Sequence, residues 1–125
     1  MNFWEPIRNG GGVFSGPPVP HERGHIGKQT RNIEVCLHVN NGDCYVRVWF
    51  DRKKTENTSE RRDRIKDLFR CSEYKYEDAD TEEYRTLIFP VCNKGKNDRD
   101  DWDEIRDKLV NMGTDIYSII DRSGL

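Results

Sequence analysis

A β-hairpin over residues 33–50 is the feature that most restricts how this chain of 125 residues can fold. Asn41-Gly42 lies at its centre and favours a two-residue type I′ turn, whose central residues both need positive φ. With the turn placed there, four cross-strand pairs are apolar on both strands: Val39 with Cys44, Leu37 with Val46, Val35 with Val48, and Ile33 with Phe50. A one-residue slip would mix the two faces. Turn chemistry and side-chain alternation therefore predict the same register.

The second face of this hairpin carries polar, aromatic and cationic side chains. Its pairs are Glu34 with Trp49, Cys36 with Arg47, and His38 with Tyr45. Aromatic rings interleaved with Arg on a sheet can stack the bases of a single-stranded nucleic acid. The alternative is that a partner subunit or the N-terminal segment, through Phe3, Trp4 or Phe14, covers this face, and covering is the outcome that we expect.

Residues 1–31 differ from the rest of the chain and are expected to form an arm ahead of a single domain over residues 32–125. Two Gly/Pro-rich stretches, at residues 10–12 and 16–20, deny regular structure to this segment. We expect an irregular arm that packs across the surface. Its second half is basic, through Arg23, Lys28 and Arg31, and an alternative is that these residues contact a polyanion.

The remaining pattern predicts an α+β fold. A helix follows Asn57 to about Arg70, strands are expected at residues 73–77 and 84–92, and a long helix begins near Asp98. Pro90 removes a backbone donor, which indicates an edge position or a bulge. The order ββαββα predicts a two-layer sandwich, in which a four-stranded antiparallel sheet carries both helices on one face.

The charge balance and the cysteines restrict the environment of the protein. The formal net charge of −2 provides no global positive field that would attract nucleic acid or an anionic membrane. No apolar run approaches the roughly 20 residues of a membrane span, and the start lacks the order of a secretory signal. The four cysteines form no CxxC motif. We therefore expect free thiols, a cytoplasmic location and no membrane partner.

Several of these segments together are similar to an uncharacterised bacterial domain family that is often fused behind restriction-endonuclease-like nuclease domains. The matching features are Phe3-Trp4, the hairpin that ends in Phe50-Asp51, the charged helix, the strand at residues 85–89 and the closing helix at residues 101–105. The resemblance covers most of the chain and implies a context of prokaryotic or phage DNA metabolism and defence. It brings no catalytic residues and no cofactor.

Two constellations suggest metal chemistry. Asp51 followed by Glu73 and Lys75 has the residue types of a D…ExK nuclease site, in which carboxylates bind Mg²⁺. His21 and His25 have a spacing that ligates metal from a helix, but Pro20 and Gly24 favour a loop. We expect neither site to form, and no metal or cofactor is predicted.

The sequence therefore predicts a non-catalytic binding module that contacts a protein or a nucleic acid through its aromatic-basic face. The predicted binding residues are His38, Tyr45, Arg47, Trp49, Arg23, Lys28 and Arg31. Three alternatives stay open: a phage-type inhibitor of a host defence complex, a metal-dependent nuclease, and a structural homodimer.

Overall fold

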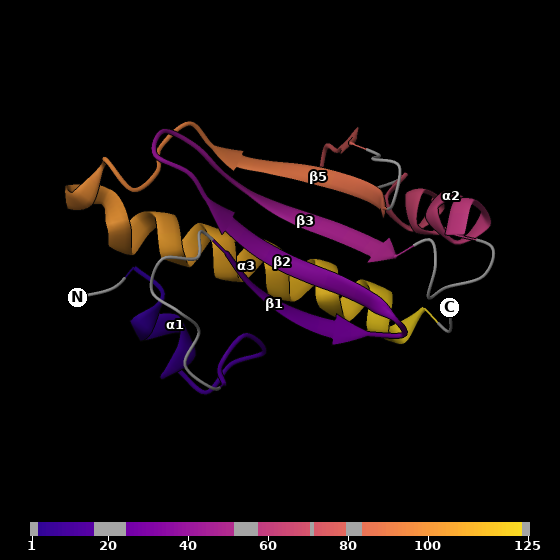
Figure 1. The fold of residues 1–125 in the computed structure, drawn as a ribbon, viewed down its shortest axis with the longest axis horizontal. Coiled ribbons are helices and arrows are strands. Elements are labelled where there is room, and N and C mark those ends of the chain that lie inside the picture. Colours follow the sequence, from indigo (N-terminus) through magenta and orange to yellow (C-terminus); the bar gives the residue numbers. More distant parts are fainter. Residues whose placement is uncertain (1–2, 17–24, 52–57, 71, 80–83, 124–125) are drawn as a thin grey trace.

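The structure is a computed structural model that describes residues 3–16, 25–51, 58–70, 72–79 and 84–123. Its elements in chain order are α1 (Glu5–Arg8), β1 (His25–Thr30), β2 (Ile33–Val39), β3 (Cys44–Asp51), α2 (Thr58–Phe69), β4 (Glu77–Asp78), β5 (Tyr84–Cys92), the 3-10 helix η1 (Arg99–Asp101) and α3 (Trp102–Arg122). The strands form one antiparallel sheet in the order β1-β2-β3-β5-β4. Helix α3 runs along one face of this sheet (Figure 1).

The predicted register of the central hairpin is confirmed. Strands β2 and β3 pair antiparallel, with Val35 opposite Val48, Leu37 opposite Val46, and Val39 opposite Cys44. Val35, Leu37, Val46 and Val48 have no exposed surface. This side of the hairpin is the centre of the core, because alternate side chains of a strand point to one face of the sheet.

The turn lies at the predicted position, where the Asn40 N–H donates to the Asp43 carbonyl at 2.9 Å, but it is not of type I′. Neither Asn41 nor Gly42 has a left-handed φ. The N–H groups of Lys96 and Asn97 instead donate to the carbonyls of Asn40 and Asn41, at 2.8 and 3.0 Å. A remote segment therefore sets the conformation of this loop.

Two consecutive residues with left-handed φ lie instead in the preceding turn, between β1 and β2. Arg31 and Asn32, with φ of 52° and 63°, connect β1 to β2. Two consecutive positive φ values are what a two-residue type I′ hairpin requires.

The sheet has five strands where the sequence predicted four. The additional strand, β1, lies in the segment expected to be irregular, where its backbone pairs with β2 and Ile26 is buried opposite Leu37. β4 has two residues only, so Tyr74 and Tyr76 lie outside any strand. Pro90 lies beside a register shift in β5 and beyond the short β4 ladder. The prediction of an edge position or a bulge at Pro90 is thus confirmed.

Helix α3 supplies most of the layer behind the sheet. It buries Ile105, Leu109, Ile116 and Ile120. Gly113 is also buried, where α3 passes closest to β2. Helix α2 lies at the end of the sheet (Figure 1) and buries Ile65 and Phe69. Among the described residues, no helix combines the length and the apolar character needed to cross a membrane.

The described part of the N-terminal arm, residues 3–16, contributes to the same core. Trp4 has no exposed surface, and Phe3, Ile7 and Phe14 are buried beside it. The rings of Phe3 and Trp102 meet edge to face at 5.4 Å, which attaches the arm to the start of α3. The arm therefore packs on the helix side of the sheet.

Candidate functional site on the open sheet face

The outer face is the side of the sheet opposite α3. It is built from alternate strand positions, and we define it by the residues His25, Gln29, Glu34, Cys36, His38, Tyr45, Arg47, Trp49 and Thr86. No helix among the described residues lies over it, since α3 and the arm pack on the other side (Figure 1). The sequence-based prediction that Phe3, Trp4 or Phe14 covers this face is wrong.

Three aromatic rings form a continuous stack across β1, β2 and β3. The His38 ring lies between those of His25 and Tyr45, at centroid distances of 4.8 and 4.9 Å and interplanar angles of 13° and 7°. Both faces of the His38 ring are thereby occupied. A base cannot stack on His38, and the stack presents mainly ring edges to a partner.

His38 is neutral at ordinary pH because of this environment. Burial disfavours the imidazolium and lowers the pKa of His38 to about 4, and the positive charge of Arg47 and the nearby His25 add to the shift. Its Nε2 atom is buried and has no hydrogen-bond partner in the described part of the chain. The stack therefore contributes shape and aromatic surface to the outer face, and little charge.

A second group of side chains surrounds Trp49. The indole N–H donates to Cys36 Sγ at 3.3 Å, and the Cys36 thiol donates to the Glu34 carboxylate at 2.6 Å. Burial, followed by the contact with Glu34, raises the pKa of Cys36 to about 12, so this thiol stays protonated. The Arg47 guanidinium lies over the indole ring, 5.5 Å from its centroid. Trp49 is thus contacted by Cys36 of the neighbouring strand β2 and by Arg47 of its own strand β3.

Arg47 is the unsatisfied member of this group. Its Nε is buried with no hydrogen-bond acceptor, and no carboxylate within the described residues forms an ion pair with its guanidinium. Buried polar groups of this kind normally have partners. An unpaired guanidinium on a central strand, on a face over which no described helix lies, is a position suited to an anionic group.

The structure separates the other predicted basic residues from this site. Lys28 lies opposite Val35 in the ladder, so it alternates to the helix side of the sheet. Arg31 lies in the β1–β2 turn and its Nε donates to the carbonyl of Asp121 at the end of α3, at 2.8 Å. Arg23 lies outside the described residues. Of the predicted binding residues, His38, Tyr45, Arg47 and Trp49 come together.

The geometry gives no support to the D…ExK site. Asp51 lies opposite Tyr84 at one end of β5, whereas Glu77 of β4 pairs with Ile88, about 13 Å along that strand. Because β4 is antiparallel to β5, the chain before it continues away from Asp51, and Tyr74 there donates to Asp115 of α3. Glu73 and Lys75 are therefore in a segment that leads away from Asp51.

Within the described residues, no group of three or more His, Cys, Asp and Glu side chains has the geometry to hold a metal ion. His21, which was considered as a metal ligand together with His25, lies outside those residues. His25 itself belongs to the ring stack.

Two components of the molecule were missed from the sequence. His25 joins the outer face only because β1 forms, and alternation over residues 25–30 with Ile26 and Thr30 inward was the available signal. The second is the proximity of Cys44 and Cys92, whose Sγ atoms are 3.0 Å apart. The position of Cys92 depends on the bulge beside Pro90, and the proline did not indicate which residue of β5 would lie opposite Cys44.

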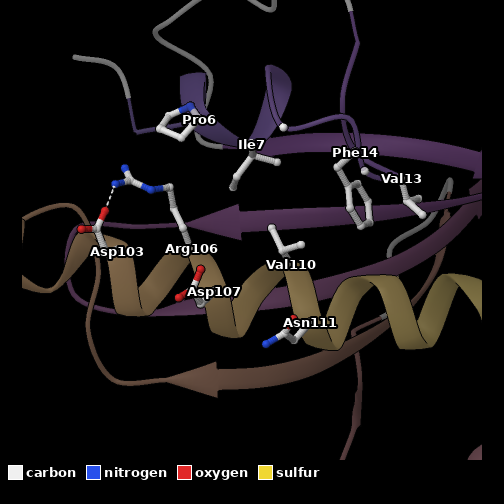
Figure 2. Close-up of a pocket in the computed structure, with 11 residues that line it drawn as sticks. Pro6, Ile7, Val13, Phe14, Asp103, Arg106, Asp107, Val110 and Asn111 are labelled. Atoms are coloured by element: carbon white, nitrogen blue, oxygen red, sulfur yellow. Dashed lines mark hydrogen bonds and ion pairs between the residues drawn. The ribbon is translucent and has the colours of Figure 1, made fainter.

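A cavity of about 500 Å³ lies between the arm and α3 (Figure 2). Ile7, Val13, Phe14 and Val110 give it apolar walls. Arg106 is buried at one end, where it donates to the carbonyl of Phe3 at 3.2 Å and pairs with Asp103. No described polar side chain in the wall is both buried and unpartnered.

Comparisons with known proteins do not assign this chain to a family. A scan against protein-family models, a search of curated proteins and a search of solved structures each found no match for the chain. The resemblance to a nuclease-associated domain family stays a prediction. The candidate site therefore rests on its own described residues: a sheet face with one aromatic stack and one unpaired guanidinium.

Proposed function

We propose that the protein is a non-catalytic binding module whose outer face takes a segment of a partner polypeptide. The observation that carries this proposal is the unpaired guanidinium of Arg47 beside the indole of Trp49. A carboxylate of the partner would pair with Arg47, and an apolar side chain would lie against Trp49 and Tyr45. Trp, Tyr and Arg are the residues that dominate binding energy in protein interfaces.

The charge of the outer face favours a polypeptide over a nucleic acid. Arg47 is the only Lys or Arg among its described strand positions, and Glu34 and Glu77 place carboxylates on the same side. Nucleic-acid affinity grows with the number of phosphates that cations neutralise, and one guanidinium provides little. The ring stack also removes His38 as a platform for bases.

The context follows from the sequence resemblance and is part of the proposal. A module of this kind would act as an accessory or inhibitory subunit in prokaryotic or phage DNA metabolism and defence. Its role would be to hold another protein, and the outer face requires no metal or cofactor for that role.

Selection of random 12-residue peptides displayed on phage tests this proposal. The peptides are selected on the wild-type protein, with counter-selection on the double variant Arg47→Ala/Trp49→Ala. We expect the selected peptides to be rich in Asp and Glu and to bind the wild type at least about tenfold more tightly than the double variant. Replacing their acidic residues by the matching amides should cause a similar loss.

Lys28→Ala provides the matched control, because it removes a cation of the same sheet from the opposite face. It should leave peptide affinity unchanged. Equal binding to wild type and double variant would reject the site. If oligothymidylate bound more tightly than the peptides and its binding depended on Arg47, the inferred partner would be a nucleic acid. If sedimentation showed self-association that depends on Arg47, the inferred partner would be a second copy of the chain. Either result would overturn the proposal.

A further inference from the structure

Cys44 and Cys92 face each other across two neighbouring strands. Cys44 begins β3, Cys92 ends β5, and the two are direct partners in the ladder. Both are free thiols, and their Sγ atoms are 3.0 Å apart. Opposed residues of antiparallel strands have Cα atoms about 4.5–5.5 Å apart, within the range that a disulfide spans. A bond between the sulfurs needs them to approach by about 1 Å.

The bulge in β5 creates this pair. Tyr45 lies opposite Pro90 and Cys44 lies opposite Cys92, so Val91 is the extra residue. In an unbroken ladder, Cys44 would lie opposite Val91. Bulges redirect side chains in this way and are treated as built features of a sheet. The proximity of the two thiols is therefore a consequence of the local backbone and not of chance side-chain placement.

The two thiols differ in access. Cys44 is 2% exposed, whereas Cys92 is half-buried at the end of its strand. Burial, followed by the hydrogen bond with Cys92, raises the pKa of Cys44 to about 12. A dissolved oxidant therefore reaches Cys92 first, and Cys44 is placed to react with the product.

We propose that the Cys44–Cys92 dithiol is an oxidative modification site, which a hydroperoxide converts into an intrachain disulfide. In the first step the Cys92 sulfur takes one oxygen of the peroxide and becomes a sulfenic acid, and the peroxide leaves as water or an alcohol. In the second step the Cys44 sulfur attacks the Cys92 sulfur. The S–S bond forms, the S–O bond breaks, and the hydroxyl leaves as water with the Cys44 proton. The two sulfurs together lose the two electrons that reduce the peroxide.

The disulfide would also restrict the chain. It would close the segment between residues 44 and 92, which contains α2 and β4. It would join the start of β3, next to the hairpin loop, to the end of β5. The segment after β5 contains Lys96 and Asn97, whose N–H groups donate to the carbonyls of Asn40 and Asn41 in that loop. Since both cysteines belong to or pack against the hydrophobic core on the helix side, this site is separate from Arg47 and Trp49 and independent of the proposed partner.

Treatment of the folded protein with hydrogen peroxide tests the proposal. Thiols are counted with a maleimide after unfolding, and non-reduced tryptic peptides are sequenced by mass spectrometry. We expect two thiols to be lost together, one linked peptide pair that joins Cys44 to Cys92 and is two hydrogen atoms lighter, and full reversal by dithiothreitol. The linked form should melt roughly 10 °C higher, because the unfolded chain is restricted. Closure should be faster at alkaline pH, where more Cys44 is ionised.

Cys36 is the internal control, since its neighbours are a carboxylate and an indole and not a second thiol. Cys36→Ser should leave the linked pair unchanged. If that variant does not fold, fragment ions of the linked wild-type peptides show whether Cys36 or Cys44 is bonded to Cys92. Cys92→Ser and Cys44→Ala should each abolish the paired loss. The proposal is overturned if Cys92 proceeds to a sulfinic acid without pairing, or if either variant still loses two thiols together.

Discussion

Gly113 of α3 lies directly against Leu37 of β2. A Cβ at position 113 would clash with Leu37 Cδ2 and would lie 3.1 Å from Phe14 Cε2. The absence of a side chain therefore lets the helix approach the central strands and lets the arm close over both.

Gly113→Ala should destabilise the protein although alanine favours helices. The helix would gain about 1 kcal/mol from propensity, but forcing a methyl group against Leu37 and Phe14 costs about 1–3 kcal/mol. We expect a net loss of about 1 kcal/mol in the free energy of unfolding, measured with urea. Gly12→Ala is the control, because no atom lies within 4 Å of a Cβ there. Leu37→Val in the Gly113→Ala background should recover part of the loss, and a stabilising effect of Gly113→Ala would show that the helix has room at this point.

Trp4→Ala should cause a large loss of stability. Trp4 has no exposed surface and meets Phe3 edge to face at 4.9 Å, and truncation of a buried aromatic side chain costs about 3–5 kcal/mol. Urea unfolding measures the loss, with Trp4→Phe as a milder variant if Trp4→Ala does not fold. Glu5→Ala changes an exposed neighbour and should stay within about 0.5 kcal/mol of wild type. An unchanged unfolding midpoint in Trp4→Ala would mean that the arm is not part of the core.

His38 should make the stability depend on pH. Its pKa falls from 6.5 to about 4 on folding, so in this range the unfolded chain binds a proton that the folded chain does not. The contribution is complete above pH 6.5 and is lost as the pH falls towards 4. After discounting for solvent screening of a half-buried ring, we expect about 1 kcal/mol.

His38→Phe keeps a ring in the stack and removes the titration. Its free energy of unfolding should therefore decline less than that of the wild type between about pH 7 and pH 5. Urea titrations across this range provide the comparison, and nuclear magnetic resonance of the His38 ring gives its pKa directly. Parallel declines in the two proteins would show that His38 is not the group responsible.

The outer face illustrates how much of a site can be predicted from alternation. Tyr45, Arg47 and Trp49 follow one another at every second position of one strand, so they share a face whatever the rest of the chain does. Lys28 and Arg31 were predicted as binding residues only because the second half of the arm is basic. Their positions depend on β1, a strand that the Gly/Pro-rich composition of the arm did not suggest.

The sequence by itself determined the register of β2 and β3 and the division of their side chains into a buried set and an outer set. Those properties follow from a period of two that every extended backbone has. Tertiary structure alone decided the conformation at Asn41-Gly42, the addition of β1 and the meeting of Cys44 with Cys92. Each of these depends on which remote backbone groups satisfy the hydrogen bonds of a loop or a strand edge, and local side chains do not encode that choice.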